Sequence, residues 1–239
     1  MGLTSWIAFR KGPEHVTLMG YLVLLEDEID AAMTPAIESG LYVTALHNHF
    51  TREQPRVMFM HIEATADEAT LATGVRRALD GIDRVRSENP VRAGSGSVSS
   101  RLDQSTLEDI VGAKAEVKAG VTKFVLGRPD VPLRCMRCGG LEINSAMGYN
   151  TWAAFQEIEE RAAVCGDFAV LELEAAPVIR ELRQGGIAVF AMHNHMFFED
   201  PRMIFMHYWG VGAVGHLART LRKALDSQNG TVKTSCCSS

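Results

Sequence analysis

The feature that most limits the fold of this chain is an internal repeat. Sliding the 239-residue sequence against itself by 146 residues aligns Trp6 with Trp152 and Asp80 with Asp226 without a gap. Of the 75 aligned positions, 26 are identical. A repeat of this length indicates that one folding unit has been duplicated. The length alone permits one large domain or two small ones, and the repeat favours two similar lobes.

The repeat divides the chain into four stretches. Residues 1–86 form the first repeat, 87–104 a linker rich in Pro, Gly and Ser, 105–233 the second repeat, and 234–239 a flexible tail. Residues 105–146 have no counterpart before Met1, so we expect a first repeat that is shortened at its N-terminal edge. A missing strand there would expose a sheet edge or an apolar patch. This predicts a homo-oligomer or hetero-oligomer in which a partner covers that edge.

Within each repeat, the hydrophobic pattern predicts the order β-α-β-β-α. In the first repeat, residues 21–26, 41–50 and 56–62 are expected to be strands, and residues 29–38 and 66–82 helices. A β-α-β crossover makes its two strands parallel, and the third strand returns as a hairpin. The predicted class is α+β, with helices packed on mostly antiparallel sheets. The two tandem copies are expected to be related by a pseudo-two-fold axis.

Composition and charge exclude several classes of protein. With 24 Lys and Arg against 29 Asp and Glu, no global basic field favours nucleic acid. No apolar run approaches the ~20 residues that cross a bilayer, and no signal peptide is evident. We therefore expect a cytoplasmic protein without a nucleic-acid or membrane partner.

The sequence has five cysteines, and this odd number favours reduced thiols. The lone C-x-x-C at Cys135 and Cys138 favours structural or incidental thiols.

Six of the eight histidines fall in one motif that occurs twice. The first copy contains His47, Asn48, His49 and His61, and the second contains His193, Asn194, His195 and His207. Two histidines at i and i+2 with a third from the paired strand can form a metal site, and zinc, iron, copper and nickel all accept imidazole. All six histidines are therefore candidate ligands of a divalent transition metal such as zinc, or acid–base groups, with one site in each lobe. The alternative is that they are structural histidines that bond nearby loops.

Carboxylates and arginines flank these histidines in both repeats. Glu26, Glu28, Glu172 and Glu174 are candidate catalytic acids, bases or metal ligands, and the alternative is that they favour the start of a helix through its dipole. Arg56 and Arg202 could bind a carboxylate or phosphate of a substrate, as could the amides Asn48 and Asn194. The alternative for the arginines is an ion pair within the loop, with Glu53 or Glu199.

Together these motifs resemble the bacterial LppY/LpqO family. The resemblance rests on residues 6–9, 24–28, 45–49, 55–56 and 59–61, and on residues 150–155 with the second His-Asn-His block. It covers nearly the whole chain except the linker and the tail. It implies an internally duplicated domain of unknown function, found in lipoproteins and soluble proteins, and it supports the two-copy α+β fold. Members often carry an export signal and a full first copy, and this chain departs from that pattern.

Three hypotheses for function follow. The first is an enzyme that acts on a small polar molecule at a His- and Glu-lined site in one or both repeats, by metal-dependent or acid–base catalysis. An elimination or ring-closing step in specialised metabolism is one example, in which His or Glu takes a proton while Arg56 or Arg202 holds an anionic leaving group. The second is a non-catalytic module that binds a metal, a ligand or a partner protein. The third is a structural subunit of a heteromeric complex.

Overall fold

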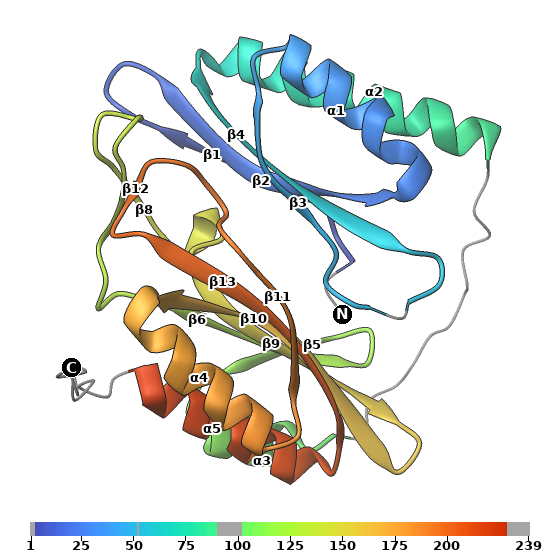
Figure 1. The fold of residues 1–239 in the computed structure, drawn as a ribbon, viewed down its shortest axis with the longest axis vertical. Helices are drawn as coiled ribbons and strands as arrows, with labels where there is room; N and C mark the ends of the chain where they lie inside the picture. Colours follow the sequence, from blue (N-terminus) through green and yellow to red (C-terminus); the bar gives the residue numbers. More distant parts are fainter. Residues whose placement is uncertain (1–2, 52, 90–101, 229–239) are drawn as a thin grey trace, which may run out of the picture.

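The first repeat forms a four-stranded sheet with two helices on its outer face. The computed structural model describes residues 3–51, 53–89 and 102–228 (Figure 1). The elements of the first repeat are β1 (Trp6–Lys11), β2 (Val16–Leu25), α1 (Ile29–Glu38), β3 (Tyr42–His47), β4 (Val57–Ala66) and α2 (Glu68–Glu88). The strand order is β1-β2-β4-β3, and all neighbouring strands are antiparallel.

The second repeat has the same elements behind a longer lead-in. The lead-in comprises α3 (Gln104–Val111), β5 (Ala115–Lys118), β6 (Val121–Gly127), β7 (Leu133–Cys135) and β8 (Leu141–Ile143). The repeated elements are β9 (Asn150–Ile158), β10 (Arg161–Leu171), α4 (Glu172–Gln184), β11 (Ala188–His193), β13 (Met203–Gly212) and α5 (Val214–Gln228). The large sheet has the order β11-β13-β10-β9-β6-β5, and the short β12 (Glu199–Asp200) joins β7 and β8 in a third sheet.

The predicted α+β class with antiparallel sheets is confirmed, but the predicted unit was one strand short. Each repeat has the order β-β-α-β-β-α, because β1 and β9 precede the strands that the sequence pattern revealed. The strand β1 ends in the polar residues Arg10 and Lys11 and lies at the edge of its sheet, so its apolar signal is weak. In the second repeat, Asp103 caps the start of α3 by accepting from the amides of Ser105 and Thr106.

The two sheets face each other, with helices on the outside of both (Figure 1). Side chains alternate between the two faces of each strand. In β4, Met60 and Ile62 pack in the core under α1 and α2, so Phe59 and His61 face the other lobe. In the second repeat, the equivalent strand β13 places Met206 and Tyr208 in the core on the helix side of its sheet. The layer between the sheets therefore receives the histidines of both repeats.

A repeated glycine lets the first two strands of each unit approach closely. Gly20 pairs with Ile7 across β1 and β2, and Gly166 pairs with Ala153 across β9 and β10. A Cβ at Gly166 would overlap the carbonyl oxygen of Trp152 and the hydroxyl of Tyr208. The identity of this position in both repeats is thus explained by backbone contact.

We expect Gly166→Ala to destabilise the protein by roughly 1–3 kcal/mol or more, because backbone atoms must move to admit the methyl group. Gly127→Ala is the matched control, since a Cβ there meets Ser145 only at an ordinary 3.4 Å. Urea unfolding of both variants measures the difference. Equal midpoints for the two variants would contradict the steric explanation of the repeated glycine.

The described residues test the predicted repeat boundaries only in part. The helix α2 continues to Glu88, two residues past the predicted end of the first repeat at 86. Most of the predicted linker, residues 90–101, and the predicted tail, residues 234–239, lie outside the described residues.

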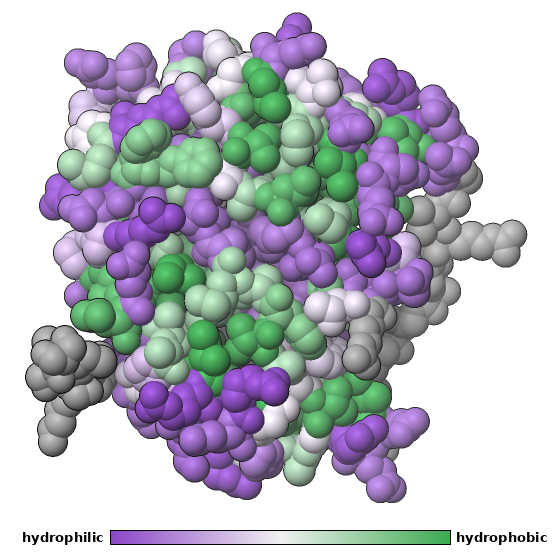
Figure 2. All heavy atoms as spheres, in the orientation of Figure 1, coloured by the Kyte–Doolittle hydropathy of each residue, from purple (hydrophilic) through white to green (hydrophobic). Residues whose placement is uncertain are grey.

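The strand β1 is an edge strand, whereas its equivalent β9 is paired with β6. Figure 2 shows hydrophobic residues gathered over both lobes on the face in view. A partner that covers the edge at β1 stays a prediction.

Two further expectations concern the cysteines and the membrane. Cys135 and Cys138 form a disulfide, so the expectation of reduced thiols is wrong for this pair. Their spacing allows it, because β7 turns back at Cys135 and the amide of Cys138 donates to the carbonyl of Cys135. Among the helices of the described ranges, none has both the length and the apolarity that crossing a bilayer requires.

Candidate functional site

The six motif histidines form one cluster between the two sheets. The ring centroids of His47 and His193 lie 3.7 Å apart. The contacts between the repeats are reciprocal: His49 stacks on His207 at 3.4 Å, and the equivalent pair of His195 and His61 lies at 4.4 Å. The expectation of a separate site in each lobe is therefore wrong, because the two histidine faces are packed against each other.

The strands explain why these side chains converge. Both β3 and β11 end at the first histidine of the motif, His47 or His193. The hairpin register places Ala45 opposite His61, and Ala191 opposite His207, which confirms the predicted return of the third histidine. Each edge strand also has a bulge at the equivalent place, between residues 43 and 45 and between residues 189 and 191.

The histidines are held in an environment that favours neutral imidazole. Burial lowers the pKa of His47 to about 4, of His49 to about 2 and of His193 to about 3. Burial also lowers the pKa of the other three, His61, His195 and His207, well below the usual range. Neutral imidazole is the form that binds metal ions.

Most of these rings also have nitrogen atoms without a hydrogen-bond partner. Among the described residues, this holds for Nε2 of His47, His49 and His61 and for both ring nitrogens of His195. Buried polar groups are normally satisfied, and each one left unpaired costs about 1–3 kcal/mol. If these histidines were purely structural, the unpaired ring nitrogens would need hydrogen-bond partners within the protein. The lack of such partners among the described residues favours a bound ion or ligand.

One buried carboxylate joins the cluster, and it comes from the second repeat alone. Oδ2 of Asp167 lies 3.5 Å from Nε2 of His195 and 3.9 Å from Nε2 of His207. Burial raises the pKa of Asp167 well above its usual range, and its Oδ1 has no hydrogen-bond partner. The equivalent residue of the first repeat is Tyr21, whose pKa burial raises to about 12. The two halves of the cluster therefore differ in chemistry.

Three sets of residues in the described ranges bring metal-ligating atoms together. In each set the atoms lie within 4.8 Å of one another. The sets are Asp167 with His193 and His207, His47 with His61 and His193, and His47 with His49 and His207. The first set contains a carboxylate, and the other two consist of histidines.

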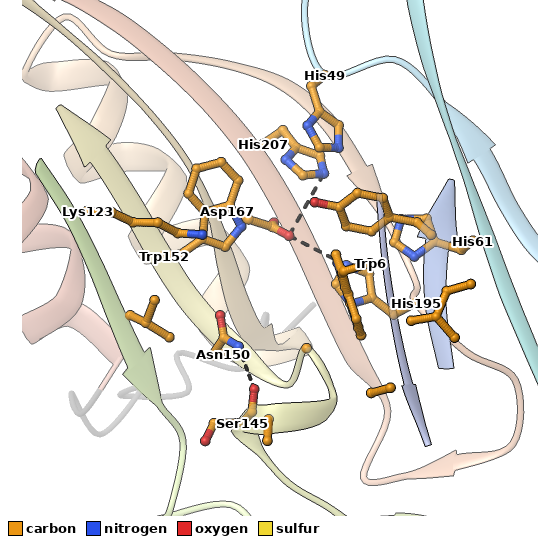
Figure 3. A pocket seen from close by; sticks show the side chains of 16 residues that line it. Trp6, His49, His61, Lys123, Ser145, Asn150, Trp152, Asp167, His195 and His207 are labelled. Atoms are coloured by element: carbon orange, nitrogen blue, oxygen red, sulfur yellow. Dashed lines mark hydrogen bonds and ion pairs between the residues drawn. The ribbon is translucent and has the colours of Figure 1, made fainter. Parts of the chain in front are cut away.

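A cavity of about 400 Å³ opens beside the cluster (Figure 3). Asp167, His195 and His207 point into it from the second lobe, and His49 and His61 from the first. Its other walls include Trp6, Tyr21, Trp152, Asn150 and Lys123. The ammonium group of Lys123 lies 5.1 Å from the centre of the Trp152 ring. A small molecule in this cavity would touch the histidine cluster, an aromatic wall and one exposed cation.

The predicted catalytic glutamates lie at helix starts, away from this cavity. The Glu28 carboxylate accepts from the backbone amide of Leu25 and binds Arg86 at 2.6 Å. Glu174 accepts from the amide of Leu171 in the same way, and its oxygens are bound by Arg128 at 2.8 Å. Their expected placement beside the histidines is wrong, because they cap the helices that follow. Glu26 and Glu172 are exposed in the same turns.

The predicted substrate-binding residues also lie elsewhere. Arg56 is exposed and pairs with Glu26 at 3.6 Å, so its expected partner Glu53 is replaced by a residue of the β2–α1 turn. Arg202 is exposed and does not line the cavity. The Asn48 amide donates to the carbonyl of Phe50, and the Asn194 amide to that of Met196 at 3.0 Å. Both asparagines therefore hold the turns that carry the second histidine.

Residues that the sequence interpretation missed are Asp167, Tyr21 and Lys123. Asp167 had a visible signal, since it is an acidic residue inside the apolar run of residues 162–171, and an unpaired carboxylate is rarely buried. Tyr21 could have been found as its counterpart at the offset of 146. Lys123 had no such signal, because it lies in the lead-in that the first repeat lacks.

The family of the chain follows from comparison with known proteins. Residues 1–81 and 105–227 match the family described as "Domain of Unknown Function (DUF1259)". The chain belongs to this family. The unmatched residues 82–104 include the end of α2 and the stretch that follows it up to α3, and the two matched segments cover most of both repeats.

The other comparisons add no functional information. No curated protein matches the chain. Two solved structures have overall similarity, a trimeric bacterial microcompartment shell protein, PduB, and a fused permuted hexameric shell protein from the RMM microcompartment. The first is 13% identical, with 88% of this chain and 76% of that chain covered and a TM-score of 0.23. The second is 10% identical, with 95% and 96% covered and a TM-score of 0.22. At these TM-scores the likeness supports no argument about this chain.

Proposed function

We propose that this protein is a metal-dependent enzyme that acts on a small anionic molecule between its two lobes. The observation that carries the proposal is the set formed by Asp167, His193 and His207, whose ligating atoms lie within 4.8 Å of one another. Two histidines and one carboxylate form a ligand set of mononuclear iron(II) centres with open coordination positions, and zinc enzymes use similar sets. The proposed ion is one divalent transition metal for each chain.

The difference between the repeats supports a single centre on the second-lobe side. At the position of Asp167, the first repeat has Tyr21, whose neutral phenol is a poor replacement for a carboxylate ligand. The negative charge of Asp167 is also the only formal charge that the described residues of the cluster bring to a cation. The remaining histidines then surround the centre as hydrogen-bonding groups.

The cavity walls support an anionic substrate of modest size. A volume of about 400 Å³ lies within the range of small-molecule sites. Lys123 supplies a positive charge near the ring of Trp152, and the Asn150 amide is held by the carbonyl of Ser145 at 2.8 Å. The bound metal would polarise an oxygen of the substrate. Tyr21 and His49 line the same cavity and could form hydrogen bonds with the substrate.

Several finer hypotheses remain predictions. The reaction, whether an elimination or a ring closure, is not dictated by any residue of the site. Kinship with the LppY/LpqO proteins, the pseudo-two-fold relation of the copies, an oligomeric assembly and a cytoplasmic location are predictions of the same kind. The alternative function is a non-catalytic module, in which the metal is fully ligated by protein side chains and no position is left for a substrate.

Cobalt(II) substitution separates an open catalytic centre from a closed one. We expect tag-free protein to bind one cobalt(II) ion, and azide, a small anionic probe, to change the visible spectrum of that ion by occupying an open position. Lys123→Met should weaken the azide effect while the cobalt(II) content stays unchanged. Stoichiometric cobalt(II) with a spectrum that azide does not alter would contradict the enzyme proposal, and absence of bound cobalt(II) would contradict the metal centre itself.

A further inference from the structure

A second cavity lies between the lobes and shares no lining residue with the first. Its volume is about 700 Å³. It is lined by Leu3, Phe50, Thr51, Glu53, Gln156, Phe190 and Trp209. The first four belong to the first repeat and the last three to the second. The cavity therefore depends on the docking of both lobes, and its size suits a small organic ligand.

Glu53 provides the ionisable group in the described lining of this cavity. Both of its carboxylate oxygens are buried, and neither has a hydrogen-bond partner among the described residues. No residue of the described lining carries a positive charge. A buried carboxylate without a partner is costly, and a cation offsets that cost by pairing with it.

The walls around this carboxylate are aromatic. The ring of Phe50 meets that of Trp209 edge-on, with centroids 5.4 Å apart, and Phe190 lines the same space. Aromatic faces attract organic cations through their negative charge density. Apolar walls with one convergent carboxylate are thus complementary to an ammonium group attached to a hydrophobic body.

The equivalent region on the other side of the molecule is filled by the chain itself. Adding the repeat offset to Leu3, Phe50 and Glu53 gives Tyr149, Met196 and Glu199. These three surround a void of only about 10 Å³, because Leu133 of β7 and Ile143 of β8 pack into it. Figure 1 shows β8 and β12 at that side of the layer between the lobes.

On the filled side, a cation from the chain itself lies beside a buried carboxylate. Glu63 is the repeat equivalent of Trp209. Its Oε1 lies 4.0 Å from Nη1 of Arg137, and the Arg137 guanidinium lies 3.6 Å from the centre of the Tyr42 ring. A cation between a carboxylate and an aromatic ring is thus supplied internally on this side. The described residues of the open side provide the carboxylate and the rings without the cation.

We propose that the second cavity binds a small organic ammonium ion with an arylalkyl or similarly apolar body. The ammonium group pairs with Glu53, and the body packs against Phe50, Phe190 and Trp209. This site is separate from the proposed metal centre, and its occupancy does not depend on the reaction that occurs there.

The probe for this site is 4-phenylbutylamine, titrated calorimetrically into the protein at pH 7. We expect saturable binding with a stoichiometry of one, and Glu53→Gln should weaken it by roughly ten- to hundredfold because a charged hydrogen-bond acceptor is lost. The neutral analogue 4-phenylbutan-1-ol should bind the native protein about as weakly as the amine binds Glu53→Gln. Glu26→Gln is the matched control, because Glu26 is an exposed carboxylate outside the cavity, and it should leave the affinity unchanged.

The metal content and the unfolding midpoint of Glu53→Gln show that the variant is folded. Absence of saturable binding of the amine to the native protein would overturn the proposal. Equal affinity of the native protein and Glu53→Gln would overturn it too, as would equal affinity for the amine and the alcohol. None of these results would affect the metal centre, whose failure is detected separately by the cobalt(II) experiment.

Discussion

Replacing Asp167 with Asn is expected to weaken metal binding by roughly 100-fold or more, because the substitution removes the one carboxylate of the proposed ligand set. The measurement is competition with a chromophoric chelator, followed by elemental analysis of the tag-free protein. Tyr21→Phe is the matched control at the equivalent position of the first repeat, and it should retain the native affinity. Full metal content and native affinity in Asp167→Asn would contradict the proposed centre.

The stability of the metal-free proteins distinguishes a ligand from a structural residue. Oδ1 of Asp167 is buried without a hydrogen-bond partner, so the carboxylate is a cost to the metal-free fold. We therefore expect metal-free Asp167→Asn to unfold at the same temperature as the metal-free native protein or above it. A lower unfolding temperature would indicate that Asp167 stabilises the fold, and the loss of metal could then follow from local disorder.

The second large effect concerns the fold. Arg128→Met is expected to reduce the free energy of unfolding by about 3–5 kcal/mol, because it removes one partner of a buried ion pair. The side chain of Arg128 is 7% exposed and that of Glu174 is 10% exposed, and the same guanidinium also binds Asp130 and the carbonyl of Ala169. The Glu174 carboxylate would lose its guanidinium partner in the buried interior, whereas Asp130, whose side chain is 48% exposed, can be hydrated, and the carbonyl of Ala169 keeps the amide of Gln228 as a donor.

The first repeat supplies the matched comparison for this effect. Arg86 binds Glu28 in the equivalent helix cap, where the Glu28 side chain is 1% exposed but that of Arg86 is 53% exposed, so the guanidinium itself is largely hydrated. We expect Arg86→Met to cost less, about 1–3 kcal/mol, because the buried Glu28 carboxylate keeps the amide of Leu25 as a donor and the lost guanidinium was bound at the surface. Guanidinium chloride unfolding of both variants gives the difference. Equal costs would contradict the argument that burial of the arginine determines its contribution.

The sequence predicted much of each lobe but not how the lobes meet. The offset of 146 residues identified both copies, and the hairpin register placed His61 and His207 correctly, because periodicity and turn spacing act within one unit. Docking of one sheet on the other depends on the shapes of whole faces. The merging of two expected histidine sites into one cluster was therefore beyond what spacing could indicate.

The glutamates show a second limit of sequence reasoning. Glu28 and Glu174 occupy equivalent positions, and both the catalytic and the helix-capping interpretations fitted the pattern. The structure favours capping because arginines neutralise both carboxylates. Those arginines come from α2 in one repeat and from the segment after β6 in the other, so the repeat alignment could not pair them. Asp167 was predictable in principle, from its place within an apolar strand.

Anomalous diffraction from crystals of the metal-loaded protein, measured at the absorption edge of the bound ion, tests the proposed metal centre directly. We expect one anomalous peak for each chain, about 2.0–2.2 Å from a carboxylate oxygen of Asp167 and from a ring nitrogen each of His193 and His207. A peak held by first-repeat histidines without Asp167, or no peak within the histidine cluster, would contradict it.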